Sequence, residues 1–185
     1  MPFTPTWIYT PAEDTHLLCS AAQREVRPAD HVLEVGTGSG IIAAELSKLA
    51  ASVVATDINP FAVAYAHAQG IDVIRTDLFA GLKGLFDLVV FNPPYLPTKA
   101  DERIDDWLEY ALDGGESGRV VIGRFAGEVS RVLAPQGRIL VLISSLTGLP
   151  EVTELFTKNG YPVAVIREQV VEDETLYVLR MTGSF

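Results

Sequence analysis

"HVLEVGTGSG" (residues 31–40) joins an apolar run to a loop in which every second residue is a glycine. Residues 31–36 predict a buried β-strand, and the apolar pattern of residues 39–50 predicts the helix that follows it. A strand, a glycine loop and a helix in this order form the start of a βαβ unit. In parallel sheets built from such units, ligands bind beyond the carboxyl ends of the strands.

The alternation of strand and helix continues along the chain. Further strands are expected at residues 51–57, 71–77, 86–92 and 137–144, and helices at 60–69, 119–135 and 150–160. Residues 161–170 and 174–181 predict a closing hairpin. We therefore predict an α/β fold: a doubly wound, Rossmann-like, mostly parallel seven-stranded sheet with a C-terminal antiparallel hairpin.

Two helix starts carry local signals. In the first, Thr10 is expected as the N-cap, Pro11 at the first helical position and Glu13 as the partner in a capping box. Asn59 and Pro60 are expected to cap and open the helix after the second strand.

Composition limits the classes of protein that the chain can belong to. It has 185 residues, of which 48% are hydrophobic, so it can form a substantial core and is not a disordered chain. No apolar run approaches the roughly 20 residues of a membrane span, and the N-terminus shows no secretory signal. The single cysteine, Cys19, fits a reducing cytoplasm and a buried structural thiol.

The formal net charge is −10, and no cluster of Lys and Arg is visible. Nucleic-acid binding usually depends on such clusters, because they displace counterions from phosphates. Tight, unaided nucleic-acid binding is therefore not expected.

The glycine loop has its own ligand preference. Its spacing is G-x-G-x-G at Gly36, Gly38 and Gly40, whereas the dinucleotide fingerprint G-x-G-x-x-G would need a glycine where the chain has Ile41. Glu34 beside the loop would repel a pyrophosphate but could accept from an ammonium group. Both features argue against a nicotinamide-dependent dehydrogenase.

Two further carboxylates follow predicted strands. Asp57 lies about 20 residues beyond the loop, where a carboxylate can accept from ribose hydroxyls, and Asp77 is placed to meet an adenine amine. Either could instead be a turn residue, since "DINP" is also good turn chemistry. A glycine loop with these carboxylates suits S-adenosylmethionine, and the pattern resembles the class I methyltransferases.

"FNPPYL" (91–96) ends the fourth predicted strand. Pro93 and Pro94 have no N–H, so they stop the strand and cannot compete as donors, and Tyr95 supplies a ring face. The Asn92 oxygen and a nearby backbone carbonyl can both accept from one planar amine. Two such acceptors stabilise the positive charge that develops on the nitrogen as it takes a methyl group. The alternative interpretation is a strand-terminating turn with a structural tyrosine.

The motifs "VLEVGTGSG", "TDINP", "TDLF" and "DLVVFNPPYLPT" occur in the order of the HemK-related protein glutamine methyltransferases, which the chain resembles. "YTPAEDTHLL" and "GGESGRVVIGRF" resemble the archaeal and eukaryotic branch in particular. The resemblance spans nearly the whole chain. It implies one methyltransferase domain over residues 1–185, with a helical segment (1–30) at the mouth of the site and a catalytic core (31–185).

That family methylates the glutamine amide in the Gly-Gly-Gln loop of class I peptide release factors, and the resemblance implies the same reaction here. Catalysis is expected from Asn92, Pro93 and Tyr95, with no metal. Cofactor-binding residues are expected to be Thr15, Glu34, Gly36, Gly38, Gly40, Asp57, Ile58, Asp77, Leu78 and Asn92. Substrate-binding residues are expected to be Tyr9, Pro11, Glu13, Asn92, Pro93, Pro94 and Tyr95.

The resemblance also implies a protein partner besides the release factor. Members of this branch typically pair with a small zinc-binding activator that adds a strand to the sheet edge, expected here at residues 71–76. The acidic segment 101–109 is interpreted as a solvated loop or short helix, with the alternative that it faces a basic surface of the substrate.

Two other functions remain open at the level of sequence. The same NPPY chemistry would serve an adenine exocyclic amine in DNA or RNA, with the flipped base stacked on Tyr95. A non-catalytic cofactor-binding module would need a damaged site, whereas every motif here is intact.

Overall fold

The computed structural model describes residues 6–98 and 106–183, and within them seven strands form one sheet in the order β3-β2-β1-β4-β5-β7-β6. The first five strands are parallel, and β7 runs antiparallel between β5 and β6. The predicted fold class is therefore confirmed. The strands are β1 (His31–Val35), β2 (Ser52–Asp57), β3 (Val73–Arg75), β4 (Phe86–Phe91), β5 (Leu133–Ser144), β6 (Val163–Val171) and β7 (Glu174–Thr182).

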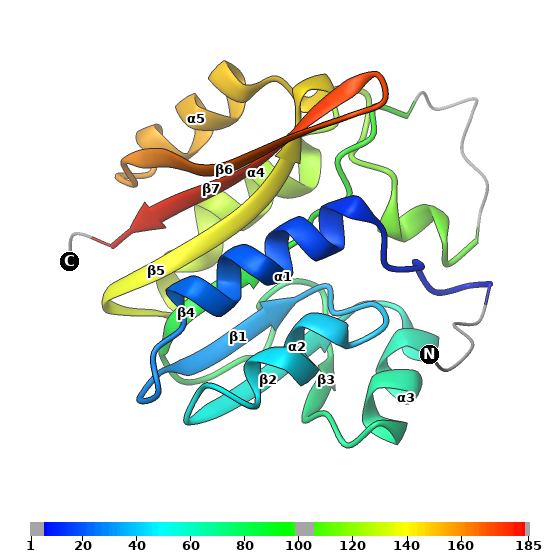
Figure 1. Ribbon diagram of the computed structural model, residues 1–185, viewed down its shortest axis with the longest axis vertical. Coiled ribbons are helices and arrows are strands. Elements are labelled where there is room, and N and C mark those ends of the chain that lie inside the picture. The colour runs from blue at the N-terminus through cyan, green and yellow to red at the C-terminus, as the bar shows by residue number, and fades with distance from the viewer. Residues whose placement is uncertain (1–5, 99–105, 184–185) are drawn as a thin grey trace.

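Helices cover both faces of the sheet (Figure 1). One face carries α1, α2 and α3, and the other carries α4 and α5. The helices are α1 (Glu13–Glu25), α2 (Ile41–Leu46), α3 (Pro60–Ala68), α4 (Val120–Glu128) and α5 (Leu149–Lys158), with short 3-10 turns η1 (Glu109–Ala111), η2 (Val129–Arg131) and η3 (Ser145–Thr147).

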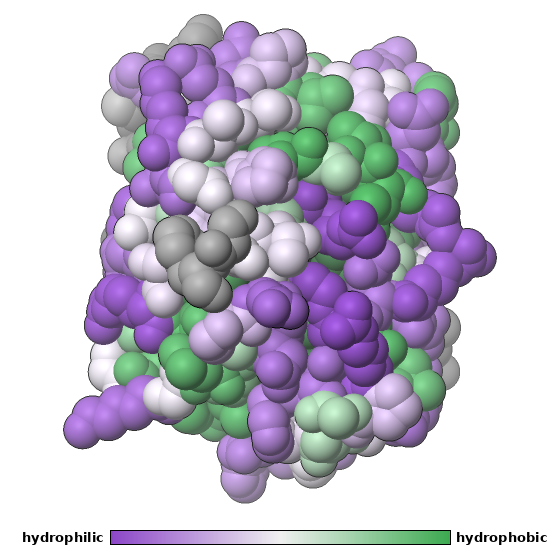
Figure 2. Space-filling model, turned by 90° about the vertical axis from the view of Figure 1, so that its left-hand side faces the viewer, coloured by the Kyte–Doolittle hydropathy of each residue, from purple (hydrophilic) through white to green (hydrophobic). Residues whose placement is uncertain are grey.

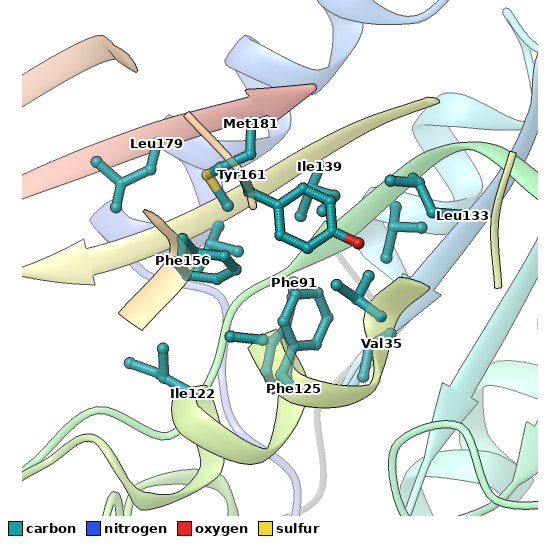
Figure 3. Packing of buried hydrophobic residues seen from close by; sticks show 14 of the residues in the cluster. Val35, Phe91, Ile122, Phe125, Leu133, Ile139, Phe156, Tyr161, Leu179 and Met181 are labelled. Carbon is teal, nitrogen blue, oxygen red and sulfur yellow. The ribbon is translucent and has the colours of Figure 1, made fainter. Parts of the chain in front are cut away.

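The face under α4 and α5 is packed around phenylalanine rings (Figure 3). Phe125 of α4 stacks on Phe91 of β4 with 4.8 Å between ring centroids, and it also meets Phe79 and Phe156. Each aromatic pair of this kind adds about 0.5–1.5 kcal/mol beyond the burial of its area. Because Phe91 directly precedes Asn92, this packing holds the end of β4 in place.

The start of α1 differs from the expectation. The helix begins at Glu13, and the residue before it, Ala12, is extended and caps nothing with its side chain, so the predicted capping box at Thr10 and Glu13 was wrong. The Tyr9 hydroxyl instead donates to Asp14, which holds the preceding segment outside the helix. The cap at Asn59 is confirmed, since its side chain accepts from the Phe61 N–H.

Two strand boundaries also differ. β3 is shorter than predicted, because only Val73–Arg75 pair with β2. β5 begins four residues earlier than predicted, at Leu133, and its register against β4 shifts between Leu133 and Arg138. Pro135 cannot donate to the ladder and Gln136 has a φ of 60°, so these residues form the irregularity in the strand.

A buried ion pair ties α1 to the centre of the sheet. Arg138 of β5 pairs with Asp30 and also donates to the Glu25 carbonyl at the end of α1. Both side chains of the pair are 7% exposed, so neither charge can be satisfied by water if its partner is removed.

The end of the molecule at the amino ends of the parallel strands is largely hydrophilic, with separate hydrophobic areas (Figure 2). Among the described residues, no helix is long and apolar enough to cross a membrane. Of the acidic segment 101–109, Asp101, Glu102 and Asp105 lie outside the described residues.

Arg138→Met should destabilise the protein by about 3–5 kcal/mol, because it leaves the Asp30 carboxylate buried without its partner. Equilibrium unfolding in guanidinium chloride measures the change. The matched control is Lys158→Met, which breaks the exposed pair with Glu154 and should leave the midpoint within experimental error. An unchanged midpoint in Arg138→Met would contradict the role of the buried pair.

Candidate active site

A cavity of about 850 Å³ lies beyond the carboxyl ends of β1, β2 and β4. Its walls come from the N-terminal segment with the start of α1, the loops after these strands, and residues 107–124. The strand order places β1 between β2 and β4, so the loops after these three strands meet at one edge of the sheet.

Most of the predicted site residues meet at this cavity. Those that line it are Tyr9, Pro11, Thr15, Glu34, Gly36, Gly38, Asp57, Ile58, Asp77, Leu78, Asn92, Pro93, Pro94 and Tyr95.

The cavity wall lacks two residues of the predicted set, Glu13 and Gly40. Glu13 precedes the buried Asp14 in the first turn of α1, and one step along a helix turns a side chain by about 100°. Gly40 packs inward instead: its φ is +80°, and an added Cβ would lie 2.4 Å from Ile71 Cδ1. A glycine at this position therefore allows close packing against Ile71 and against Ala66 of α3.

The glycine loop is held by the carboxylate of Asp57. Gly38 N–H donates to Asp57 Oδ2 at 2.8 Å, and Asn59 N–H donates to Oδ1 at 2.8 Å. Asp57 is thus also the turn residue that the alternative interpretation described. Each carboxylate oxygen accepts up to two bonds, so capacity remains for a ligand in the cavity.

Glu34, near the end of β1, also holds the glycine loop through hydrogen bonds. It is 3% exposed, and its Oε2 accepts from Thr37 Oγ1 at 2.6 Å and from Ala43 N–H at 3.0 Å. Both bonds fall on Oε2, which leaves Oε1 as the oxygen for a ligand. Burial raises the pKa of the Glu34 carboxyl to about 8, although the two hydrogen bonds oppose the rise.

Asp77 follows β3 and lies at the half-exposed rim of the cavity. It pairs with Arg124 of α4 at 2.8 Å, and this hydrogen bond raises the pKa of the Arg124 guanidinium. Leu78, the next residue, has a φ of 47° and is buried. The pair therefore connects the loop after β3 with α4 across the cavity rim.

The Asn92 side chain has a fixed orientation. Its Nδ2 donates to Asp14 Oδ2 at 3.0 Å, and a carboxylate can only accept, so the amide oxygen points away from Asp14. That oxygen, Oδ1, is buried and has no hydrogen-bond partner among residues 6–98 and 106–183. A buried acceptor without a partner is rare in proteins and needs an explanation, and for a residue of the cavity wall a ligand donor is one.

Asp14, which was not predicted as a site residue, is the centre of this arrangement. The hydroxyls of Tyr9 and Tyr95 lie 3.1 and 3.5 Å from its Oδ2, and Thr15 donates to its Oδ1 through both N–H and hydroxyl. Burial and the charge of Asp14 raise the pKa of both tyrosines above the ordinary value. Both phenols therefore stay protonated and can donate.

The "GGESGR" segment supports the NPPY turn directly. Leu96 exchanges backbone hydrogen bonds with residues 112 and 114, and Thr98 N–H donates to the Gly115 carbonyl. Gly118 has a φ of +69°, and an added Cβ would lie 2.5 Å from the Tyr95 carbonyl oxygen. The two sequence motifs are therefore one packed unit in which glycine is required for close approach.

The two tryptophans differ in position. Trp107 lines the cavity, and its ring centroid lies 5.2 Å from that of Tyr110. The guanidinium of Arg75 in β3 lies over the Trp107 ring, 5.9 Å from its centroid. Trp7 packs on Phe61 of α3, with 5.5 Å between the ring centroids.

The charge around the cavity is strongly negative. Within the described part of the chain it is lined by one guanidinium, that of Arg124, and by the carboxylates of Asp14, Asp57, Asp77, Glu109, Asp113 and Glu174, while the Glu34 carboxyl, with its raised pKa, is mostly protonated at neutral pH. Such a wall favours a neutral or cationic ligand over a polyanion.

Comparison with known proteins gives a consistent result. Residues 12–108 match the methyltransferase small domain family. A Methanocaldococcus jannaschii protein, provisionally named a protein N5-glutamine methyltransferase, is 39% identical over 93% of this chain and 90% of its own. The human methyltransferase HEMK2 is 34% identical over 96% of this chain and 90% of its own.

A solved structure of similar shape comes from E. cuniculi. It is the Mtq2–Trm112 complex, described as responsible for methylation of the translation termination factor eRF1. The similarity has a TM-score of 0.81 and 31% sequence identity, and it covers 97% of this chain and 100% of the matched chain.

The raised pKa of Glu34 predicts a pH dependence of stability. The folded state holds the Glu34 proton up to about pH 8 while the unfolded state releases it near pH 4.5, so ionisation of Glu34 destabilises the fold as pH rises between these values. Glu34→Gln should remove this contribution. The melting temperature of the variant relative to that of the native chain should therefore increase from pH 5 to pH 8.

The matched control is Glu45→Gln, a more exposed position on α2, which shows how the loss of a surface glutamate affects the melting temperature over the same pH range. A difference for Glu34→Gln that is constant over this range would show that Glu34 titrates normally.

Proposed function

Since the chain belongs to the HemK-related protein glutamine methyltransferase family, we propose that it methylates the glutamine amide in the Gly-Gly-Gln loop of a class I peptide release factor. The family membership supports a methyltransferase of protein side-chain amides. The proposal treats residues 1–185 as one methyltransferase domain, and the contribution of Tyr9 and Asp14 to the cavity wall supports the inclusion of the N-terminal segment.

One observation carries this proposal: the buried, unpartnered Oδ1 of Asn92 at the cavity wall. A primary amide nitrogen brings two N–H groups and therefore needs acceptors. Asn92 Oδ1 is such an acceptor, and Nδ2 of the same side chain already donates to Asp14. The arrangement therefore suits a planar –NH2 group.

The proposed cofactor is S-adenosylmethionine, and the residues at the cavity fit it. Gly36 and Gly38 leave the loop backbone open to close approach, and nothing lies within 4 Å of a Cβ added at Gly38. Asp57 offers acceptors for ribose hydroxyls, and Asp77 offers one for the adenine amine. Oε1 of Glu34 would accept from an ammonium group, whose positive charge would favour the ionised form of this carboxyl. When bound, S-adenosylmethionine supplies an electrophilic methyl group.

The chain's own residues prepare the substrate nitrogen. Asn92 Oδ1 accepts one N–H, which orients the nitrogen lone pair and offsets the positive charge that develops there. The rigid NPPY turn, braced by Gly118, fixes this oxygen in position, so orientation contributes as well. We propose that Pro93 supplies the second acceptor through its carbonyl and that Tyr95 lines the path of the side chain.

The charge of the cavity supports a protein over a nucleic acid as substrate. Six carboxylates besides the mostly protonated Glu34 and one guanidinium line it in the described residues, and a polynucleotide would bring further negative charge to this surface. A release factor acts at the ribosome, so we keep the expected cytoplasmic location as part of the proposal.

We further propose that a small zinc-binding activator adds a strand to the edge at residues 71–76. β3 pairs only with β2 in the described sheet, so its other side is free to pair, and Ile74 is exposed there. The similar E. cuniculi chain was solved as a complex of Mtq2 with Trm112. Arg75 of this strand also contacts Trp107 at the cavity, so the edge and the site share a residue.

The test is transfer of a labelled methyl group to a class I release factor, with and without the activator. We expect labelling of the native factor and none of its Gln→Ala loop variant or of DNA. Asn92→Ala should remove transfer and leave cofactor affinity nearly intact, because the glycine loop and Asp57 are untouched. Labelling of DNA alone would establish the adenine alternative, and full activity of Asn92→Ala would contradict the mechanism.

Asp57→Ala should instead weaken cofactor binding, since it removes the carboxylate that holds Gly38 N–H and faces the cavity. Calorimetry should show a loss in affinity of about tenfold or more, the equivalent of about 1.4 kcal/mol. The comparison variant is Asp87→Asn at the amino end of β4, far from the cavity, which should bind normally. Unchanged affinity in Asp57→Ala would refute the role in ribose binding.

A further inference from the structure

Asp14 is a buried carboxylate that serves neither the glycine loop nor an ion pair in the described part of the chain. It is 4% exposed, and the groups around it are donors: the hydroxyls of Tyr9 and Tyr95, the N–H and hydroxyl of Thr15, and the amide of Asn92. So many donors on one buried carboxylate keep a negative charge inside the protein, one hydrogen bond away from the proposed catalytic amide.

We propose that Asp14 is a positioning residue that locks the amide of Asn92 with its oxygen toward the substrate and increases the negative charge on that oxygen. The proposal rests on the proposed methyl transfer to a side-chain amide. Under this proposal the segment "PAEDT" (residues 11–15), which leads into α1, also contributes to the reaction, because its Asp14 positions Asn92.

The first part of the argument concerns orientation. An asparagine side chain can rotate by 180° and exchange its donor and acceptor, and in the flipped state it would offer an N–H where the substrate also brings N–H groups. Asp14 prevents the flip, because the amide oxygen would then face a carboxylate oxygen at about the 3.0 Å now spanned by a hydrogen bond. If a neutral amide stood in place of the Asp14 carboxylate, it could both donate and accept, and the Asn92 side chain could then adopt both orientations.

The two carboxylate oxygens of Asp14 have different hydrogen-bond partners. Oδ1 accepts from the Thr15 N–H at 2.6 Å and from the Thr15 hydroxyl at 3.2 Å, which anchors the carboxylate to the first turn of α1. Oδ2 faces Asn92 and the two tyrosine hydroxyls. The carboxylate is thus fixed on one side and directs its other oxygen at the site, which lies 78 residues further along the chain.

The second part concerns charge. A hydrogen bond from the Asn92 amide to a carboxylate polarises the amide and strengthens its oxygen as an acceptor. The substrate nitrogen becomes more positive as it takes the methyl group, so a stronger acceptor stabilises the transition state more than the ground state. Loss of the charge should therefore appear in kcat rather than in KM.

The experiment compares Asp14→Asn with the native chain in transfer to the release factor. We expect kcat to fall by about 10- to 100-fold, the usual cost of removing a group that orients a catalytic residue, with KM and cofactor affinity unchanged. The matched control is Asp87→Asn, which neutralises a carboxylate bonded to the His31 N–H at the opposite end of the sheet and should keep native kcat.

A second measurement does not need activity. In the ¹⁵N spectrum of the native chain, the Asn92 side-chain amide, assigned by its absence in Asn92→Ala, should exchange slowly with water, and in Asp14→Asn it should exchange fast. Native kcat in Asp14→Asn, a loss of kcat with an equal loss of cofactor affinity, or unchanged exchange of the Asn92 amide would each overturn the proposal. If the native chain transfers no methyl group to any acceptor, the proposed function fails, and the exchange measurement alone decides the role of Asp14.

Discussion

The site depends on one constraint: three acidic side chains are buried at the carboxyl edge of the sheet, and each is held by N–H and O–H donors instead of a cation. Glu34 is held by Thr37 and Ala43, Asp57 by Gly38 and Asn59, and Asp14 by its tyrosines, Thr15 and Asn92. A buried carboxylate is tolerated only when its lone pairs are occupied in this way. Each carboxylate therefore binds together two chain segments that would otherwise be independent loops.

This constraint explains why the walls of the cavity have a defined shape without a ligand. The glycine loop cannot move without breaking its bond to Asp57, and Asn92 cannot rotate without facing the charge of Asp14. A site that is ordered beforehand avoids part of the entropy loss that binding would otherwise cause. The same bonds leave Oε1 of Glu34 and Oδ1 of Asn92 free in the described structure, and these two atoms are the acceptors that the proposed cofactor and substrate need.

The sequence predicted the structural features that depend on residues close to one another in the chain. The glycine spacing, the Asn59 cap and the prolines after Asn92 each act over a few residues, so the fold class and most of the cavity wall followed from them. Asp14 was missed because its partner Asn92 lies 78 residues away. The capping box was wrongly assigned for a different reason, since the local bond from Tyr9 to Asp14 takes its place. The packing of Gly40 could not be predicted either, since the lack of space for a Cβ beside Ile71 arises only in the folded chain.

The surrounding charge explains how a motif shared by amide and adenine methylation can serve one substrate. In the proposed mechanism the NPPY turn recognises a planar –NH2 group and does not distinguish the molecule that carries it. The choice between substrates then depends on the cavity wall around the turn. There, Glu109, Asp113 and Glu174 extend the negative charge beyond the buried acidic residues. Glu174 is fixed there by the buried hydroxyl of Ser144, so this charge belongs to the sheet and not to a mobile side chain. A phosphate backbone would be repelled where a basic protein surface would be attracted, and the selectivity is therefore electrostatic rather than steric.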